Sequence, residues 1–245
     1  MMLKDDAPLP DDVLSHLSGS SAVLNHAVIV DSDRWKEALA ERGLPPLQGM
    51  LAEGGRVSVS RKDIFDLGEK TLDSDNALQL LYYSLAWGLG TRASRLHQRL
   101  DGLAKNQQKA EKLLVDAWTS VKREAPVKEA YGTLIFDRGR ARISWLGPAF
   151  ATKFLYFAQG NEADARHLIL DQVVAKNLRP DAWPGSPTAA WFPEIYERYC
   201  NLLSAWAKEA SEKLCNSREV SADEIEMTLF KRHKWMTQGE QVSAG

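Results

Sequence analysis

A single lysine, Lys153, interrupts an otherwise apolar run at residues 149–158. The run follows Gly147 and Pro148, and proline is favoured in the first turn of a helix, so the pattern predicts a buried helix carrying one amine. Burial disfavours the charged form of lysine, and a neutral lysine amine is a nucleophile. The alternative is a lysine whose amine extends to the surface near the helix start.

One carboxylate, Asp171, lies 18 residues further along, within the apolar run 168–175. Aspartate is favoured at helix N-caps, so we expect it to begin a helix over about 171–178. Backbone N–H groups that bind a capping carboxylate favour its ionised form. The sequence therefore predicts a fixed negative charge beside a buried lysine.

The segment that leads to Lys153 is basic. Residues 122–153 hold seven cationic side chains against three acidic ones, a local excess of four in a chain of net charge −2: Lys122, Arg123, Lys128, Arg138, Arg140, Arg142 and Lys153 against Glu124, Glu129 and Asp137. The segment runs into the turn 145–148 between two helical patterns. A glycine turn that begins a helix offers free backbone N–H groups to an anion such as a DNA phosphate.

The elements that must position these groups are mostly helices. Apolar spacing predicts helices at 76–89, 93–124, 189–216 and 222–236, and one β-like run at 22–30. Asp31 or Ser32 should cap a short helix after that run, and Ser221 with Glu224 has the spacing of a capping box. We expect one all-α domain over 1–245, arranged in two lobes.

Composition and cysteine use exclude several classes of protein. The 245 residues are 44% apolar and 26% charged, which is typical of a folded globular chain. No run is long and apolar enough for a membrane span, and the first residues do not form a secretory signal. Cys200 and Cys215 are too far apart along one helical pattern for a disulfide, so we expect reduced thiols and a cytoplasmic protein. The five histidines lack metal-ligand spacing, and we expect neither metal nor cofactor.

The order of helix, glycine-containing hairpin, lysine helix and aspartate-capped helix resembles the helix–hairpin–helix DNA glycosylases. The closest likeness is to the bacterial 8-oxoguanine-glycosylase-like (OGG-like) branch, which includes anti-phage DNA glycosylases. It rests on 146–153 (Leu-Gly-Pro-Ala-Phe-Ala-Thr-Lys) followed by Asp171, within about 130–178, and more weakly on Ala-Trp-Gly-Leu-Gly at 86–90. The hairpin lacks the family's second glycine. The four cysteines of the iron–sulfur branch are absent.

This resemblance implies an all-α helix–hairpin–helix glycosylase fold, with two helical lobes around a central cleft and the hairpin element at about 130–158. It implies a DNA N-glycosylase that flips a modified base out of duplex DNA and cleaves its N-glycosidic bond, leaving an abasic site. Lys153 would attack the sugar and Asp171 would stabilise the developing positive charge. The lysine adduct can open to a Schiff base, which permits strand cleavage (AP-lyase activity).

Further site residues are expected from the basic segment, the hairpin and the aromatic residues near glycine and proline. DNA contacts are expected from Gly147, Pro148, Phe150, Thr152, Arg138, Arg140 and Arg142, with Arg92 and Arg95 as further phosphate contacts. The base pocket is expected from Trp87, Gly88, Trp191 and Phe230. The expected partner is double-stranded DNA that contains a modified base, with no membrane and no obligate protein partner.

Several functions remain as alternatives. We favour antiviral defence against phage DNA that carries glucosylated 5-hydroxymethylcytosine, and base-excision repair of 8-oxoguanine is the first alternative. A second alternative is a non-catalytic helix–hairpin–helix module in which Lys153 only contacts phosphate. A Schiff-base enzyme acting on a small carbonyl compound would explain the lysine but not the basic hairpin.

Overall fold

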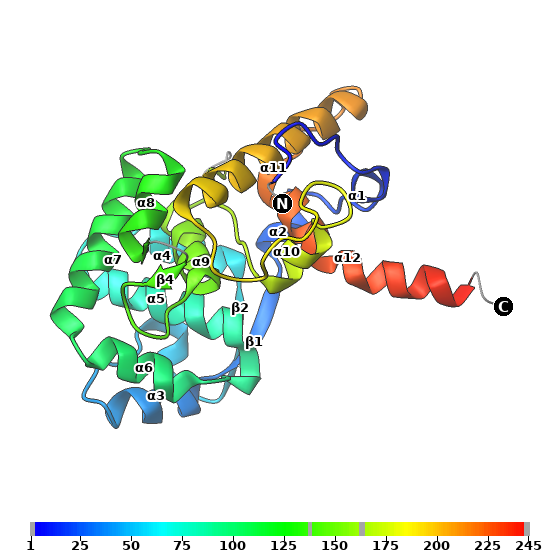
Figure 1. The fold of residues 1–245 in the computed structure, drawn as a ribbon. Helices are drawn as coiled ribbons and strands as arrows, with labels where there is room; N and C mark the ends of the chain where they lie inside the picture. The colour runs from blue at the N-terminus through cyan, green and yellow to red at the C-terminus, as the bar shows by residue number, and fades with distance from the viewer. Residues whose placement is uncertain (1–2, 137–138, 162–164, 243–245) are drawn as a thin grey trace.

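Helices make up most of the protein in the computed structural model, which describes residues 3–136, 139–161 and 165–242 and the side chains as far as residue 232 (Figure 1). The predicted all-α class is confirmed. The α-helices are α1 (Asp11–Ser15), α2 (Ser20–Leu24), α3 (Ser32–Ala40), α4 (Arg61–Gly68), α5 (Ser74–Leu89), α6 (Leu96–Ala104), α7 (Gln107–Lys122), α8 (Val127–Leu134), α9 (Pro148–Ala158), α10 (Gln172–Asn177), α11 (Pro193–Lys213) and α12 (Ala222–Val242). Arg138, an expected DNA contact, lies outside the described residues.

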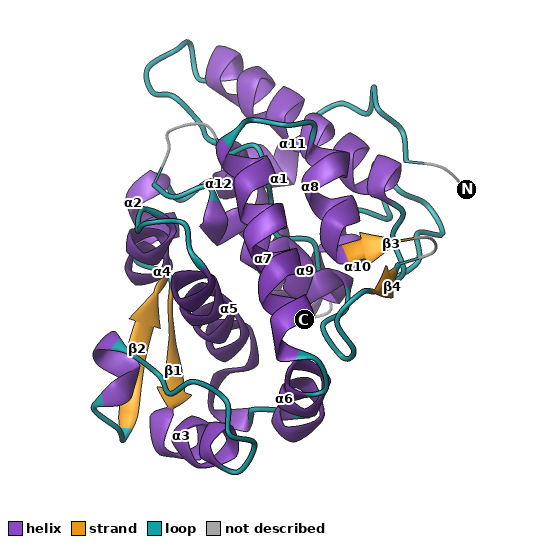
Figure 2. Ribbon diagram, turned by 90° about the vertical axis from the view of Figure 1, so that its left-hand side faces the viewer, coloured by secondary structure: helices purple, strands orange, loops and turns teal. Residues whose placement is uncertain are grey.

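Two apolar helices, α5 and α9, pack against each other in the interior (Figure 2). Every residue of α5 from Ala77 to Trp87 is buried, and so is every residue of α9 from Ala151 to Ala158. Helices α4, α7 and α8 also contact α9, which explains why this helix is apolar on all sides. Lys153 is therefore carried by an element at the centre of the fold.

Two short antiparallel strand pairs interrupt the helices. The β-like run at 22–30 divides into the end of α2 and strand β1 (Ala27–Asp31), which pairs with β2 (Arg56–Ser60). A second pair, β3 (Ile135–Phe136) with β4 (Arg140–Ala141), lies between α8 and α9. Asp31 caps α3 by accepting a hydrogen bond from the backbone N–H of Arg34. One of these four strands, β1, was predicted from the sequence. Strand β2 has only two apolar residues among its five, and β3 and β4 have two residues each.

The helix expected at 93–124 is two helices. Left-handed backbone at Ala93 and Arg95 separates the 3-10 turn η2 (Gly90–Arg92) from α6, and Asn106 caps α7 by accepting from the N–H of Lys109. The helix expected from residue 189 begins at Pro193, where a proline suits the first turn. Cys200 lies buried in α11 and Cys215 lies beyond its end, and both are free thiols.

The capping box predicted for α12 does not form. The Glu224 carboxylate instead accepts a hydrogen bond from Gly19 N at 2.7 Å and pairs with Arg218 at 2.8 Å. The Ser221 hydroxyl donates to Asp223. A long-range partner thus replaces the local one, and it ties the start of α12 to the N-terminal segment.

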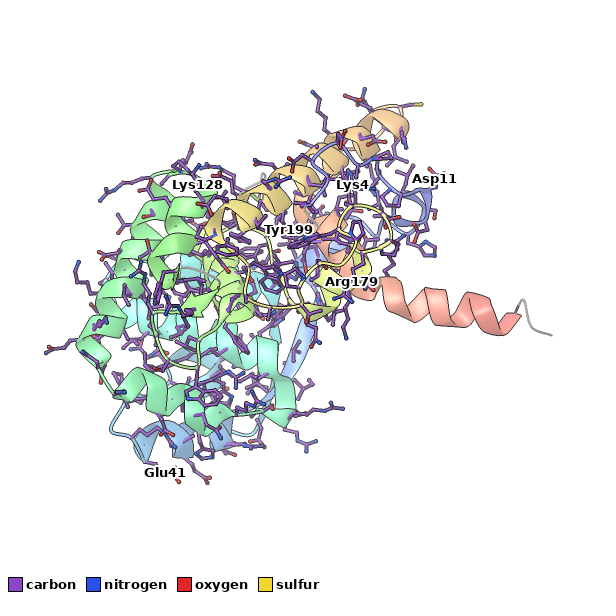
Figure 3. The ribbon with its side chains drawn as sticks, viewed as in Figure 1. Lys4, Asp11, Glu41, Lys128, Arg179 and Tyr199 are labelled. Atoms are coloured by element: carbon purple, nitrogen blue, oxygen red, sulfur yellow. The ribbon has the colours of Figure 1, made fainter. Side chains whose placement is uncertain are left out.

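The N-terminal segment packs along α11 and α12. Trp206 of α11 donates to Ala7 O, Arg198 pairs with Asp5, and Arg232 of α12 pairs with Asp12. Figure 3 shows Lys4 and Asp11 on the side of α11 toward its C-terminal end. Tyr199, which is also labelled, is buried in the interior. None of the described helices combines the length and apolar composition needed to cross a membrane.

Candidate active site

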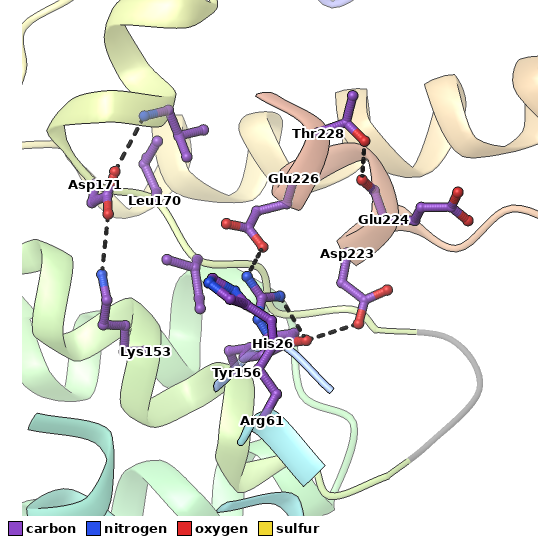
Figure 4. Close-up of polar contacts among 12 residues, drawn as sticks. His26, Arg61, Lys153, Tyr156, Leu170, Asp171, Asp223, Glu224, Glu226 and Thr228 are labelled. Atoms are coloured by element: carbon purple, nitrogen blue, oxygen red, sulfur yellow. Dashed lines mark hydrogen bonds and ion pairs between the residues drawn. The ribbon is translucent and has the colours of Figure 1, made fainter. Parts of the chain in front are cut away.

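Lys153 and Asp171 form a buried ion pair (Figure 4). Lys153 Nζ lies 3.3 Å from Asp171 Oδ2, and the lysine side chain is only 7% exposed, so its amine does not extend to the surface. Asp171 is the N-cap of α10, and its other oxygen accepts from the backbone N–H groups of Val173 (2.9 Å) and Val174 (3.2 Å). The expected cap is confirmed, and it fixes the carboxylate beside the amine.

The residues just before this pair are joined to each other. Thr152 Oγ1 accepts a hydrogen bond from Leu170 N at 3.1 Å and lies 3.1 Å from Leu170 O, to which it can donate. Thr152 is fully buried. A DNA contact by Thr152 stays a prediction, and in the structure its hydroxyl is bonded inside the protein. It instead holds α9 against the segment that ends at Asp171.

Opposing effects set the ionisation of Asp171. Burial raises the pKa of its carboxyl, but the Lys153 ammonium and the two capping N–H groups outweigh burial and hold the pKa below its usual value. The carboxyl is therefore a persistent negative charge. An amine that attacks carbon must first give up a proton, and this carboxylate is the nearest group in position to accept it.

A cavity of about 250 Å³ contains both members of the pair. We call it the Lys153 cavity; its lining residues come from β1, α4, α5, α9, the approach to α10, and α12: His26, Val28, Arg61, Trp87, Gly88, Leu89, Gly90, Lys153, Ile169, Asp171, Glu226 and Phe230. Three of the four residues expected in the base pocket, Trp87, Gly88 and Phe230, line it. Concave sites with apolar walls and a few polar groups are typical of ligand pockets.

Gly88 shapes the wall beside the lysine. A Cβ at this position would come within 2.9 Å of Lys153 Cδ and 3.3 Å of Phe150 Cε1. The absence of a side chain at Gly88 therefore leaves the space through which the Lys153 side chain extends into the cavity. Trp87, the neighbouring residue, donates from Nε1 to His26 O at 3.3 Å and lies edge-on to the His26 ring.

Trp191, the fourth residue expected in the base pocket, lies elsewhere. It is buried, donates from Nε1 to Pro187 O at 3.1 Å, and does not line the Lys153 cavity. Tyr131 donates to its carbonyl oxygen at 3.1 Å. A role for Trp191 in the base pocket stays a prediction, and the structure places this side chain in the core outside the Lys153 cavity.

A buried polar network that the sequence analysis did not find forms another wall of the cavity (Figure 4). Arg61 pairs with Glu226 at 2.8 Å and donates to Tyr156 Oη at 3.0 Å, while Tyr156 donates to Asp223 at 2.8 Å. The Arg61 guanidinium also lies over the Trp87 ring, 5.3 Å from its centroid. The network joins α4, α9 and α12. Because these helices are far apart in the sequence, no pattern among neighbouring residues predicts the contacts between them.

Glu226 is the titratable group of this network that stands out. Burial raises the pKa of its carboxyl to about 7, although Arg61 acts in the opposite direction. Side chains with strongly shifted pKa values in a cavity are candidates for function. A carboxyl group at this position offers oxygen acceptors to a molecule that enters the Lys153 cavity.

The hairpin segment presents a more open surface. Gly147 is the N-cap of α9 with Pro148 in the first turn, and no side chain caps this helix. Arg140 and Arg142 are exposed, and both guanidinium groups lie over the Phe136 ring. Phe150 is half-buried beside the cavity. The hairpin residues therefore lie where an anion can reach them.

The basic segment 122–153 does not form one patch. Lys122 pairs with Glu69 and Lys128 pairs with Glu197, both at the end of the α7–α8 pair remote from the turn before α9. Lys153 is inside the protein. The cationic side chains of this segment therefore lie on different faces, because helix geometry distributes neighbouring residues around the axis. The described residues contain no cluster of side chains suited to holding a metal ion.

An all-α fold in which a hairpin leads into a lysine helix, with a capping aspartate paired to that lysine in a cavity, is the arrangement expected from the resemblance to helix–hairpin–helix DNA glycosylases. A family model described as "Putative 8-oxoguanine DNA glycosylase OGG-like protein" matches residues 21–230. The chain belongs to this OGG-like family of DNA glycosylases. Neither the curated proteins nor the solved structures contain a significant match.

Proposed function

We propose that this protein excises a modified base from duplex DNA, with Lys153 as the nucleophile and Asp171 as the charged group that assists it. The observation that carries the proposal is the placement of the buried pair in a cavity of about 250 Å³. Enzymes that act on a base within a duplex must first extrude the nucleotide into such a cavity.

The chemistry follows from the positions of the two groups. Lys153 loses a proton to Asp171, and its free electron pair forms a bond to C1′ of the nucleotide. The C1′–N bond breaks, and its electron pair leaves with the base, which takes up the proton that Asp171 accepted and so restores the carboxylate. Positive charge that develops on the sugar is stabilised by the Asp171 carboxylate. Hydrolysis of the lysine adduct releases an abasic site, and β-elimination from its Schiff-base form would cleave the strand.

The polar wall of the cavity suggests how the base is read. Carboxylate side chains accept hydrogen bonds from amino groups of bases, as in contacts to cytosine N4. Glu226 would accept from such a group, and Trp87 and Phe230 would pack against the base. Arg61 would act by holding the Glu226 carboxyl in place. This arrangement favours a base that carries an amino group over one that lacks it.

Two modified bases fit this description. The hairpin residues Gly147–Phe150 favour glucosylated 5-hydroxymethylcytosine, and hence defence against phage, by their likeness to the bacterial branch. The description of the matching family favours 8-oxoguanine and a role in repair. Both bases carry amino groups, so the choice between them requires a direct assay.

The test is an alkali-cleavage assay on three duplexes: unmodified, with one 8-oxoguanine, and with one glucosylated 5-hydroxymethylcytosine. Hot alkali breaks the strand wherever a base has been removed. We expect cleavage at one modified position, lost in Lys153→Gln and Asp171→Asn. Borohydride added during the reaction should trap a protein–DNA adduct with the wild type only. DNA binding without release of either base would instead favour the non-catalytic module.

A further inference from the structure

Trp145 is an exposed tryptophan in an unfavourable backbone conformation. Its side chain is 52% exposed, and its φ is 65°, in the left-handed region that favours glycine. The turn that carries it is firmly held, since Ile143 and Leu146 on either side are buried. Gly102 of α6 lies so close to Ser144 that a Cβ there would overlap its carbonyl oxygen. Strained residues of this kind concentrate at functional sites.

Two guanidinium groups from one end of α6 lie over aromatic rings, one over Trp145 and one over Phe150 beside the Lys153 cavity. The Arg95 guanidinium lies over the Trp145 ring, 5.8 Å from its centroid, and Arg99 lies over Phe150 at 4.4 Å. Phe150 lies 6.0 Å from Lys153 Nζ. Arg95 is the N-cap of α6 and Arg99 lies four residues later, so both arginines come from the same end of this helix. Trp145 is three residues before α9, the helix that carries Phe150 and Lys153.

The surroundings of Trp145 are cationic. On one side is a groove of about 300 Å³ that includes Ser144 and the cations Lys105, Lys109 and Arg142. Arg95 lies over the Trp145 ring. Among the described residues, neither Arg95 nor Arg142 forms an ion pair with a carboxylate. A negatively charged ligand with flat aromatic groups would satisfy both features, and DNA offers phosphates and bases together.

We propose that Trp145 and Arg95 form a stacking platform that binds a DNA base adjacent to the nucleotide held in the Lys153 cavity. The proposal rests on the proposed function, because extruding one nucleotide leaves its neighbours without a stacking partner. An exposed indole replaces that partner, and the guanidinium behind it is free to bind the adjoining phosphate. The unfavourable conformation of Trp145 is retained because it keeps the ring outside the core.

The experiment uses a duplex that carries a tetrahydrofuran abasic analogue, so it does not depend on the identity of the modified base. 2-Aminopurine is placed in turn on each side of the analogue and opposite it. Unstacked 2-aminopurine is bright, and stacking on tryptophan quenches it. We expect wild-type protein to quench it at one of these positions. Trp145→Ala should lose this quenching and bind about tenfold more weakly, as the loss of one stacked base implies.

Three further variants separate stacking from a structural role. Trp145→Phe should retain most of the DNA affinity, because a phenyl ring still stacks on a base. Arg95→Ala should weaken binding, while Lys213→Ala, which changes a cation at the distant end of α11, should leave affinity and quenching unchanged. Trp145→Gly should lose the quenching with a Tm equal to or above that of the wild type, since glycine relieves the strained φ. Unchanged quenching in Trp145→Ala would overturn the platform, and so would a lowered Tm in Trp145→Gly. Failure of the wild type to release any base would count against the proposed function alone.

Discussion

Thr152 and Leu170 are joined by the hydroxyl of one and the backbone of the other, and each is the residue immediately before a member of the Lys153–Asp171 pair. The two backbone segments that carry the charged side chains are thus linked, next to the pair, by hydrogen bonds that involve neither charge. This makes it possible to disturb their relative placement without removing either of them.

Thr152→Val should therefore reduce both stability and base excision. Valine has nearly the same shape but leaves the buried N–H of Leu170 without its acceptor, which costs about 1–3 kcal/mol. Asp171 would then be held less firmly against Lys153. Urea unfolding and single-turnover excision measure the two effects. Thr152→Ser, which keeps the hydroxyl, is the matched control, and equal behaviour of the Val and Ser variants would contradict the positioning role.

Gly88→Ala should impair excision more than folding. The added methyl group displaces the Lys153 side chain, the flexible neighbour that it would contact at 2.9 Å. A shift of about 1 Å at a reacting atom lowers a rate by up to about 100-fold. The Tm should change little because the lysine can move. A normal excision rate in this variant would show that excision does not depend on the position of the Lys153 side chain seen in the structure.

Asp171→Asn separates the charge of this residue from its capping role. Asparagine caps a helix nearly as well as aspartate, so α10 should be preserved. Loss of the carboxylate should reduce excision about 100- to 1000-fold, with DNA binding retained. Asp171→Ala removes the cap as well and should be about 1 kcal/mol less stable than the Asn variant in urea unfolding. Wild-type excision by Asp171→Asn would exclude the proposed role.

Glu226 should make stability depend on pH. Burial raises its pKa from the usual value of 4.5 to about 7, so the folded protein binds this proton more tightly than the unfolded chain does. Its contribution to stability is complete below pH 4.5 and is lost as pH rises through about 7.

The measurement is Tm from pH 4.5 to pH 8 for the wild type and Glu226→Gln. The glutamine variant does not titrate, so the wild-type Tm relative to it should fall with rising pH. Comparison of trends cancels any constant destabilisation that the loss of the Arg61 ion pair causes. A difference in Tm that is constant across this range would mean that Glu226 does not titrate there.

The success of prediction from sequence depended on whether the cause was local. Helix α9, its buried Lys153 and the Asp171 cap follow from neighbouring residues, and they were predicted. The Arg61–Glu226 pair was not, because the partners are far apart in the chain and only the packing of α4 against α12 brings them together. The same reason explains Glu224, whose local capping pattern gave way to a distant partner, the backbone N–H of Gly19.

The cavity draws residues from β1 near the start of the chain to α12 near its end. During translation, Lys153 and Asp171 leave the ribosome before Glu226 and Phe230 do. The part of the cavity wall that contains Glu226 and Phe230 therefore does not exist when Lys153 and Asp171 first emerge. The cavity can close only after α12 has been synthesised and has packed against α10 and α11.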